Sequence, residues 1–319
     1  MGILSVWQGP PISHKPLAAF AQLYYNGARH KTTGGVPLYD LLILGSGPAG
    51  LAAAIAGRSR DLKVLVVSNP PSASPLAKAE RIDNYPGLPG VTGAELLDRL
   101  QSHAEAMGAE FLTGKALSAL DMGKRWCLTV GQDVAEGQAL IVTSGVTPVQ
   151  HIPGEERLLG RGVSYCAICD GMLYRRRSVV VIGRSGDAPQ EAAWLSSIGC
   201  QVTYVAARRP ERLPEHIPFV RGGRLEIEGT DRVEAVLADG ARLPCEGVFL
   251  LRSAVAPGDL LPGLAFRDGY IAVDRSGRTN LPRVYAAGDC TGKPFQIAKA
   301  VGEGQVAALT AAEDAEAPI

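Results

Sequence analysis

Apolar residues recur along this chain with two spacings, one typical of buried strands and the other of helices. Short, mostly apolar runs predict buried strands, and they lie at residues 39–44, 63–67, 139–143, 178–182 and 201–205. Between residues 93 and 107 the apolar positions fall three and four apart, which predicts a helix with one apolar face made by Leu96, Leu97, Leu100 and Ala104. Strands that alternate with helices in this way indicate an α/β fold.

Shorter elements fill the intervals between these segments. In chain order we predict a polar loop at 69–75, a β-meander at 116–142, short strands at 224–251 around the Asp239–Gly240 turn, strands at 270–274 and 284–287, and a closing helix at 296–312.

Composition fits a protein of two domains, each with a proper core. The chain has 319 residues, of which 46% are hydrophobic and 20% charged, which is ordinary for a globular protein. The formal net charge is zero, so neither a nucleic-acid partner nor a membrane-surface partner is expected. No apolar run reaches the length that spans a membrane. Six dispersed cysteines suit a reducing compartment, and we expect a cytoplasmic protein.

Residues 1–38 differ from the rest of the chain. They contain no acidic residue, three basic ones and several glycines and prolines. They lack the continuous apolar stretch that follows the basic residues of a secretory signal. We expect a poorly ordered N-terminal extension in which residues 17–25 form a short helix.

A glycine-rich turn follows the first predicted strand and opens an alanine-rich helix. Its residues are Gly45, Ser46, Gly47, Pro48, Ala49 and Gly50. In a Gly-x-Gly-x-x-Gly turn the first glycine permits the tight turn, the second lets the backbone approach a pyrophosphate, and the third allows close packing of helix and strand. Because the phosphates then lie at the positive end of the helix, this segment predicts a dinucleotide site.

Cys166 and Cys169 form a Cys-x-x-Cys pair, which is typical of either a redox dithiol or half of a zinc site. A structural zinc usually takes four ligands, but the other cysteines stand singly and no histidine lies at ligand spacing. The pair therefore indicates a dithiol switch and no metal site. Asp170 beside it offers a carboxylate that moves protons while the sulfurs exchange electrons. We assign the single cysteines, which are Cys127, Cys200, Cys245 and Cys290, to packing.

These motifs, together with shorter ones in a fixed order, resemble the low-molecular-weight thioredoxin reductases. The resemblance extends from Tyr39 to about Ala312. The shorter motifs are Ile82-Asp-Asn-Tyr-Pro-Gly87, Thr143-Ser-Gly145, Pro153-Gly-Glu155, Gly162-Val-Ser-Tyr-Cys166 and Ala286-Ala-Gly288-Asp289-Cys290-Thr291. The resemblance implies two Rossmann-like FAD/NAD(P)-binding domains, with the second inserted into the first.

On this resemblance, residues 39–149 and 255–319 form an FAD-binding domain, and residues 150–254 form a central NAD(P)-binding-like domain that carries the Cys-x-x-Cys pair. A homodimer with a rotating central domain is implied as well. Ser68 and Asn69 stand where the family usually has an acidic residue for the adenosine ribose. Besides the first turn, the residues expected to bind FAD are Asn84, Gly145, Gly288, Asp289, Gln296, Ile297 and Ala298.

The second glycine-containing turn, residues 183–188, departs from the family pattern. Ser185 replaces its middle glycine, and a side chain there obstructs the close approach of a pyrophosphate. We expect Asp187 to cap the helix that follows, with Pro189 in its first turn.

The stretch after the next strand departs from the pattern too. Family members that use NADPH carry a His-Arg-Arg cluster there, but Ala206 and Ala207 occupy two of the three positions in this chain. Arg208 and Arg209 compensate only if the turn is shifted. In these respects the chain is similar to a subgroup that lacks the NADPH motifs and takes electrons from reduced ferredoxin. We therefore expect FAD as the cofactor and treat NADPH as doubtful.

The resemblance implies that electrons pass through FAD and the Cys166–Cys169 pair to a protein disulfide such as that of thioredoxin. Cys169 is the sulfur nearest the flavin, Cys166 attacks the partner, and Asp170 protonates the departing thiolate. Reduced ferredoxin is the expected donor, with NADH or NADPH as the alternative. A flavin-dependent dithiol oxidase that passes electrons to oxygen and a non-enzymatic redox-signalling flavoprotein are further alternatives.

Overall fold

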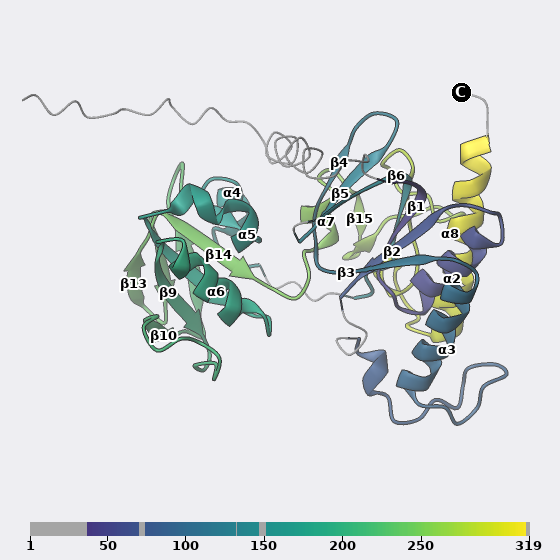
Figure 1. The fold of residues 1–319 in the computed structure, drawn as a ribbon, viewed down its shortest axis with the longest axis horizontal. Helices are drawn as coiled ribbons and strands as arrows, with labels where there is room; N and C mark the ends of the chain where they lie inside the picture. The colour runs from purple at the N-terminus through teal and green to yellow at the C-terminus, as the bar shows by residue number, and fades with distance from the viewer. Residues whose placement is uncertain (1–36, 70–73, 132, 147–150, 317–319) are drawn as a thin grey trace, which may run out of the picture.

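The computed structural model describes residues 37–69, 74–131, 133–146 and 151–316 (Figure 1). The helix predicted at 17–25 lies outside these residues, as does most of the loop predicted at 69–75. Leu38 already belongs to the first strand, so the regular structure begins at the last residue of the predicted extension. Two α/β units lie side by side and are joined where the chain passes from one to the other (Figure 1).

The first unit is built on a seven-stranded sheet. The first two strands along the chain pair in parallel, as their apolar composition predicts. The predicted meander forms the antiparallel side of the same sheet. In spatial order the strands are β3 (Glu110–Thr113), β2 (Val64–Ser68), β1 (Leu38–Leu44), β6 (Asp133–Val142), β5 (Trp126–Val130) and β4 (Ala116–Asp121), with β17 (Val284–Ala286) also paired to β6.

Three helices accompany this sheet: α2 (Pro48–Arg58), α3 (Gly93–Ala106) and α8 (Ile297–Glu316). The start of α3 is fixed by a capping box in which Thr92 and Glu95 bond each other's backbone N–H groups. The helix α2 packs closely along α8. Gly304 makes this packing possible, because a side chain there would overlap the backbone of Ala49. The closing helix starts one residue later than predicted and extends four residues further.

The second unit contains a five-stranded parallel sheet. Its order is β10 (Phe219–Arg221), β9 (Gln201–Ala206), β8 (Ser178–Gly183), β14 (Gly247–Leu251) and β7 (Val163–Ser164). An antiparallel three-stranded sheet accounts for the short strands predicted around Asp239, and it comprises β11 (Leu225–Glu228), β12 (Ala235–Ala238) and β13 (Ala241–Pro244). The helices of this unit are α4 (Glu155–Leu158), α5 (Ala167–Asp170) and α6 (Ala188–Ser197), with a 3₁₀ turn η3 (Gly171–Tyr174).

Short elements complete the first unit. They are η2 (Leu76–Lys78), α7 (Pro257–Leu260), β15 (Phe266–Arg267), β16 (Tyr270–Ile271) and η4 (Asp289–Thr291). The strand predicted at 270–274 ends after two residues, because Asp274 turns the chain by accepting hydrogen bonds from the N–H groups of Ser276 and Arg278. Neither β3 nor β10 was predicted.

The chain leaves the first unit after β6, builds the second unit and returns before α7. The fold is therefore α/β, with two Rossmann-like domains of which the second is inserted into the first, as predicted. Each domain has its own apolar clusters on its sheet. We use the predicted bounds as names: the outer domain is 39–149 with 255–319, and the central domain is 150–254. Within the described residues, no helix is both long enough and apolar enough to cross a bilayer.

Candidate redox site

The first glycine-rich turn is packed tightly at both ends and open in its middle. Gly45 has a φ of +116°, and a side chain there would overlap the carbonyl of Thr143. A side chain at Gly50 would overlap the carbonyl of Gly45. At Gly47, in contrast, an added Cβ would meet no atom within 4 Å. The turn therefore leaves its middle glycine free for the backbone approach that a pyrophosphate requires.

Thr143, at the end of β6, holds this turn from the side. Its hydroxyl lies 2.9 Å from the carbonyl oxygen of Leu44 and 3.1 Å from that of Gly45. The next hydroxyl, that of Ser144, is buried and has no hydrogen-bond partner in the structure. Gly145 follows with a φ of +66° and open space where a Cβ would stand. A buried, unpartnered hydroxyl beside an open turn fits a polar ligand.

Parallel pairing brings the Gly288–Asp289 motif to the same edge of the sheet. Leu44 of β1 and Ala286 of β17 both pair with Val142 of β6. The carboxyl ends of the three strands thus lie together, where ligands bind in open α/β sheets. Gly288 lies so close to Ala49 of the first turn that a Cβ there would approach the Ala49 Cβ to 2.9 Å.

Two residues of α8, Lys299 and Glu303, fix the backbone of the Gly288 turn. The Lys299 ammonium donates to the Gly288 carbonyl at 2.9 Å, and the Gly288 N–H donates to the Glu303 carboxylate at 2.9 Å. The two side chains are themselves 3.1 Å apart. We did not predict either residue, although their i, i+4 spacing on a helix is the signal that was available.

Asp289 lies at the start of η4 and is half-buried. Burial raises the pKa of its carboxyl, the Lys299 ammonium opposes that rise, and the Glu303 carboxylate adds to it. Asp289, Cys290 and Gly145 line a cavity of about 480 Å³ that extends to His151. The predicted residues Gly145 and Asp289 therefore face one space.

Asn84 and Gln296 also meet, although 212 positions separate them in the sequence: the Asn84 amide donates to the Gln296 side-chain oxygen at 3.1 Å. Ile297 and Ala298 are the first residues of α8 and follow Gln296 directly. Asn69, a candidate for the adenosine ribose, instead donates its amide to the Ser253 carbonyl at 2.8 Å. The structure thus ties Asn69 to the chain that leaves the central domain.

Cys166 and Cys169 form a disulfide at α5, with their Cα atoms 5.4 Å apart. Cys166 is the N-cap of the short helix, and its sulfur accepts a hydrogen bond from the Cys169 N–H at 3.0 Å. Such a bond favours a thiolate at Cys166 once the disulfide is opened. Cys166 is only 9% exposed, whereas Cys169 is half-buried. Cys166 is therefore accessible to a protein partner only if this loop becomes uncovered.

Asp170 follows the pair and keeps its proton more readily than an exposed aspartate. Burial raises the pKa of its carboxyl, and a hydrogen bond from Ser164 opposes this only in part. Glu191 of α6, which we did not predict, accepts a hydrogen bond at 3.3 Å from the N–H of Ala167, between the two cysteines. Burial raises the pKa of Glu191 as well. Two desolvated carboxyl groups thus lie at the dithiol loop, one in it and one contacting it from α6.

The second glycine-containing turn carries a side chain, that of Ser185, at the position where the first turn has the bare backbone of Gly47. The Ser185 hydroxyl is buried and has no hydrogen-bond partner in the structure. Gly183 packs against the hydroxyl of Tyr204, leaving no room for a Cβ. Our prediction that the Asp187 side chain caps α6 is wrong: Asp187 occupies the N-cap position but has helical φ and ψ angles, so its carboxylate makes no cap hydrogen bond. Pro189 does lie in the first turn, as predicted.

The arginines that follow β9 offer no compensating cluster in this structure. Arg209 donates to the carbonyl of Pro214 at 2.9 Å and lies 5.9 Å from the centre of the Phe219 ring. This side chain is therefore engaged in holding its own loop. Arg208 is exposed, and Ala206 and Ala207 carry no charge.

The four single cysteines are buried. Burial is the first cause that raises their thiol pKa values, to about 11 for Cys127 and about 12 for Cys245 and Cys290. The pKa of Cys200 is raised too. Thiols this reluctant to ionise are poor nucleophiles, which agrees with a packing role.

Comparison with known proteins gives a consistent result. The chain is similar to a thioredoxin reductase of Listeria innocua, with 31% identity over 300 residues that cover 86% of this chain and 93% of that protein. A solved ferredoxin-flavin thioredoxin reductase of Clostridium acetobutylicum is 39% identical and covers 87% of this chain and 98% of its own, with a TM-score of 0.77. A solved thioredoxin reductase of Gloeobacter violaceus is 30% identical and covers 88% and 96%, with a TM-score of 0.72.

The family model for pyridine nucleotide-disulphide oxidoreductases matches residues 39–304. That range includes both glycine-containing turns, the cysteine pair and the Gly288–Asp289 motif. The family and these relatives imply a flavin cofactor and disulfide chemistry. The chain belongs to the pyridine nucleotide-disulphide oxidoreductase family and is a thioredoxin reductase-like flavoprotein disulfide reductase.

Proposed function

We propose that this protein transfers electrons from reduced ferredoxin, through FAD and the Cys166–Cys169 pair, to a protein disulfide such as that of thioredoxin. Disulfide reductase activity follows from the family. The donor, the substrate and the roles of individual residues are our proposal, and each is supported below by a separate feature of the chain.

The edge of the outer sheet suits FAD. Gly47, with nothing within 4 Å of its Cβ position, would face the pyrophosphate. Asp289 would bond the ribitol hydroxyls, and Asn84 and Gln296 would lie beside the flavin ring. The remaining proposed contacts are Gly45, Ser46, Pro48, Ala49, Gly50, Gly145, Gly288, Ile297 and Ala298. When bound, FAD supplies the two electrons that open the Cys166–Cys169 disulfide.

Once reduced, the dithiol reduces the partner disulfide by thiol–disulfide exchange and needs no further reagent. The Cys166 thiolate attacks one sulfur of the partner disulfide and forms a mixed disulfide, and the departing partner thiolate takes a proton. The raised pKa of Asp170 suits it to deliver that proton. Cys169 then attacks Cys166, releases the second partner thiol and restores the internal disulfide.

The surface beside the dithiol supports a protein partner. Met172 and Leu173 follow Asp170 by two and three residues and are 57% and 50% exposed. Exposed large apolar side chains next to a reactive centre are typical of docking sites. A small disulfide protein that lays an apolar face on these two side chains would bring its disulfide to the dithiol loop, where Cys166 must first become uncovered.

The main support for ferredoxin as the donor is the side chain of Ser185 in the second glycine-containing turn. Ser185 places a side chain where a nicotinamide dinucleotide needs a bare backbone. Asp187 and Glu191 also put negative charge near the helix start that would receive the phosphates. A relative at 39% identity carries the name ferredoxin-flavin thioredoxin reductase. Reduced ferredoxin is accordingly the proposed donor.

An anaerobic titration of the flavin absorbance tests this proposal. The purified yellow protein receives NADPH, then NADH, and in a parallel cuvette reduced ferredoxin. We expect bleaching with ferredoxin only, followed by reduction of thioredoxin when it is added. Stoichiometric bleaching by NADPH or NADH would contradict the proposal that ferredoxin is the donor. Bleaching by a small dithiol with peroxide formation and no transfer to thioredoxin would indicate a dithiol oxidase.

Two further expectations accompany the proposal. Four buried, unpaired cysteines suit a reducing compartment such as the cytoplasm. A homodimer is expected from the resemblance to the thioredoxin reductases, and sedimentation of the FAD-loaded protein tests it.

A further inference from the structure

The short helix that carries the dithiol, α5, is fixed by contacts on both sides of Cys166. Before the helix, the Ser164 hydroxyl accepts a hydrogen bond from the Cys166 N–H at 3.1 Å and lies 3.2 Å from the Cys166 carbonyl oxygen. Inside the helix, the N–H of Ala167 donates to the Glu191 carboxyl at 3.3 Å. Ser164 belongs to β7, which leads into α5, whereas Glu191 reaches the dithiol loop from a separate element, α6.

One face of α6 supports the dithiol loop. Glu191, Trp194 and Leu195 are three and four residues apart, so they lie on the same side of this helix. Trp194 and Leu195 pack so closely on Gly171, just after the dithiol helix, that a Cβ at Gly171 would overlap both side chains. The two apolar residues therefore hold the far end of the loop, and Glu191 provides the polar contact beside the cysteines.

The N–H that Glu191 binds is one of the first in α5, and such groups have no acceptor within their own helix. Cys166 is the N-cap, and its sulfur accepts a hydrogen bond from the Cys169 N–H, the third of these groups. The Glu191 carboxyl accepts from the first of them, that of Ala167. The two acceptors together fix the first turn of α5, and with it the N–H that points at the Cys166 sulfur.

Glu191 is partly buried, and charged groups from two other positions act on it. Burial raises the pKa of its carboxyl, the Lys115 ammonium opposes this rise, and the charge of Asp187 adds to it. Lys115 is held at the junction of the domains, where it donates to the Arg252 carbonyl at 2.9 Å. A carboxyl oxygen accepts a hydrogen bond in either protonation state, so the contact with the dithiol helix does not depend on the charge of Glu191.

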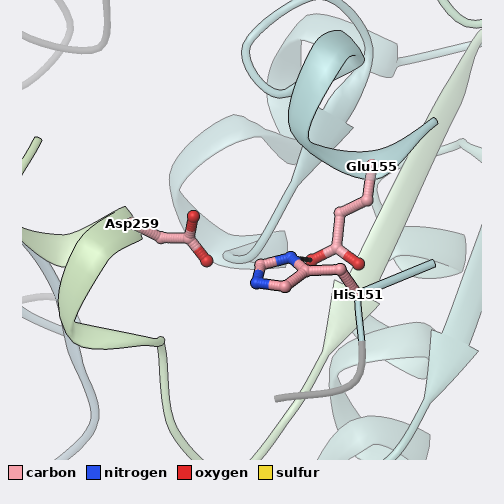
Figure 2. A group of neighbouring side chains, drawn as sticks. All are labelled: His151, Glu155 and Asp259. Atoms are coloured by element: carbon pink, nitrogen blue, oxygen red, sulfur yellow. Dashed lines mark ion pairs between the residues drawn. The ribbon is translucent and has the colours of Figure 1, made fainter. Parts of the chain in front are cut away.

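A second buried carboxylate, that of Glu155, holds the chain just before the dithiol. It accepts hydrogen bonds at 2.8 Å from the Tyr165 hydroxyl and from the Arg252 guanidinium. Figure 2 shows this carboxylate with its neighbours at the junction of the domains, His151 and Asp259. Glu155 reaches the dithiol only through the length of the Tyr165 side chain, and Arg252 balances its charge. Glu191, in contrast, contacts the backbone between the two cysteines directly.

We infer that Glu191 is a positioning residue for disulfide exchange, because its hold on the Ala167 N–H fixes the turn in which Cys166 is stabilised as a thiolate. This inference rests on the proposed role of Cys166 as the attacking sulfur. A hydrogen bond from the Cys169 N–H favours the thiolate, and the first turn of α5 keeps that N–H in place. Glu191 acts through this backbone, unlike Asp170, which is proposed to exchange a proton with the partner.

Two substitutions separate the hydrogen bond of Glu191 from its charge. Glu191→Gln keeps an acceptor oxygen and removes the charge, whereas Glu191→Leu has a similar size and removes the acceptor. Gln190→Leu, one residue earlier on α6 and exposed, is the matched control. Each change is made in FAD-loaded full-length Cys169→Ser protein, in which Cys166 is the one thiol of the pair and the backbone N–H groups of α5 are retained.

The first readout is the ionisation of Cys166, which requires neither a donor nor a partner. The ultraviolet absorbance of the thiolate is followed as the pH rises, with the protein that has serine in place of both Cys166 and Cys169 as the baseline. We expect Glu191→Leu to lower the thiolate fraction near neutral pH roughly tenfold, the effect of losing about one hydrogen bond. Glu191→Gln should keep at least the parent fraction, since it retains the acceptor and removes a negative charge that opposes a thiolate. Gln190→Leu should match the parent.

The second readout is the rate at which the prereduced protein, with both cysteines present, reduces thioredoxin after rapid mixing. Near neutral pH, Glu191→Leu should be slower by a factor similar to its loss of thiolate, and Glu191→Gln should not be slower than wild type. The difference should shrink at high pH, because Cys166 is then ionised in every variant. A general structural defect would instead lower the rate equally at every pH.

Thermal unfolding shows whether each variant is folded. If Glu191→Leu fails to fold, Glu191→Asp replaces it, because this side chain keeps the charge but is one methylene too short to keep the contact, and it should give the same loss of thiolate. A folded Glu191→Leu or Glu191→Asp that ionises like the parent would overturn the inference, and so would an equal loss in Glu191→Gln. If ionisation changes as expected but even wild type does not reduce thioredoxin, the positioning role stands and the proposed partner is wrong.

Discussion

The two glycine-containing turns follow the same path from a buried parallel strand into a helix, but they differ in what they leave open. In the first, Gly47 has nothing within 4 Å of its Cβ position, and the Ser144 hydroxyl nearby is buried and unpartnered. In the second, the Ser185 side chain fills the equivalent place, and this is the difference, because the first glycine of each turn is tightly packed, Gly45 against Thr143 and Gly183 against Tyr204. The fold survives both versions, because strand and helix packing does not depend on a bound phosphate.

The helices that follow the turns differ in charge as well. The first turn of α2 holds no acidic residue, whereas Asp187 precedes α6 and Glu191 lies in its first turn. Glu191 reaches the backbone of Ala167 within the dithiol loop. The second domain thus has the same strand–turn–helix scaffold, but a side chain from the first turn of its helix contacts the dithiol loop. Fold likeness therefore predicts a shared architecture here, and the side chains of each turn decide what binds.

Cys166→Ser should distinguish the roles of the two domains most clearly. We expect FAD content and flavin reduction by the donor to stay unchanged, since the outer domain is untouched. Transfer to thioredoxin should fall by roughly a thousandfold or more, because the attacking sulfur is gone. Flavin bleaching and thioredoxin reduction, measured on one sample, check both halves. Cys169→Ser is the matched variant and should trap the partner as a stable mixed disulfide on Cys166; turnover by either variant at the wild-type rate would refute the assignment.

Asp170→Asn should have the next largest effect. Burial favours the protonated form of Asp170 by raising its pKa, so the group donates a proton at low pH and loses this ability as the pH rises through the raised pKa. The wild-type rate of disulfide exchange should therefore decline as the pH rises through this pKa. The variant should be slower by roughly a hundredfold and should lack the decline. Rapid-mixing measurements of the prereduced protein across pH provide the test. If the variant shows the same decline of the rate with rising pH, that decline is due to another group.

Gly47→Ser copies the second turn into the first. A side chain at the open middle of the turn would press on the pyrophosphate, at a cost of about 1–3 kcal/mol, so FAD should bind roughly ten- to a hundredfold more weakly. Flavin retained after gel filtration and the dissociation constant of FAD are the measurements. Gly186→Ser, where the added Cβ also meets nothing within 4 Å, is the matched control in the second turn. Equal loss of FAD in both variants would mean that the substitution acts through folding.

The sequence could predict the parts of this comparison that depend on local pattern. The first turn, the cysteine pair and the main strands have short-range signals: glycine spacing, paired cysteines and apolar runs. Ser185 was visible as a departure because the pattern names the residue it replaces. The alternation of strands and helices predicted the α/β class, and the family resemblance carried by these motifs implied the inserted domain.

What the sequence could not show depends on residues far apart in the chain or on backbone angles. Thr143 and Lys299 hold the flavin-side turns through contacts that exist only after the sheet and α8 have assembled. The strand β3 has just two apolar residues, too few to give a pattern. The failed cap at Asp187 reflects a helical backbone that no composition rule reveals. His151 and Asp259 are 108 positions apart and meet only where the two domains join.

The smallest expected effect comes from Ser185→Gly, which copies the first turn into the second. The change removes a buried, unpartnered hydroxyl, a relief of about 1–3 kcal/mol, but adds the backbone entropy of glycine, about 0.5–1 kcal/mol, so the stability should change little. We expect NADPH to bleach the flavin no better than in wild type, because Asp187 and Glu191 remain acidic residues at the start of α6 and no basic cluster follows β9. Thermal unfolding and the anaerobic titration measure the two parts. If NADPH bleached this single variant stoichiometrically, the Ser185 side chain alone would prevent NADPH from binding. The acidic residues at the start of α6 would then matter little to the difference between the two domains.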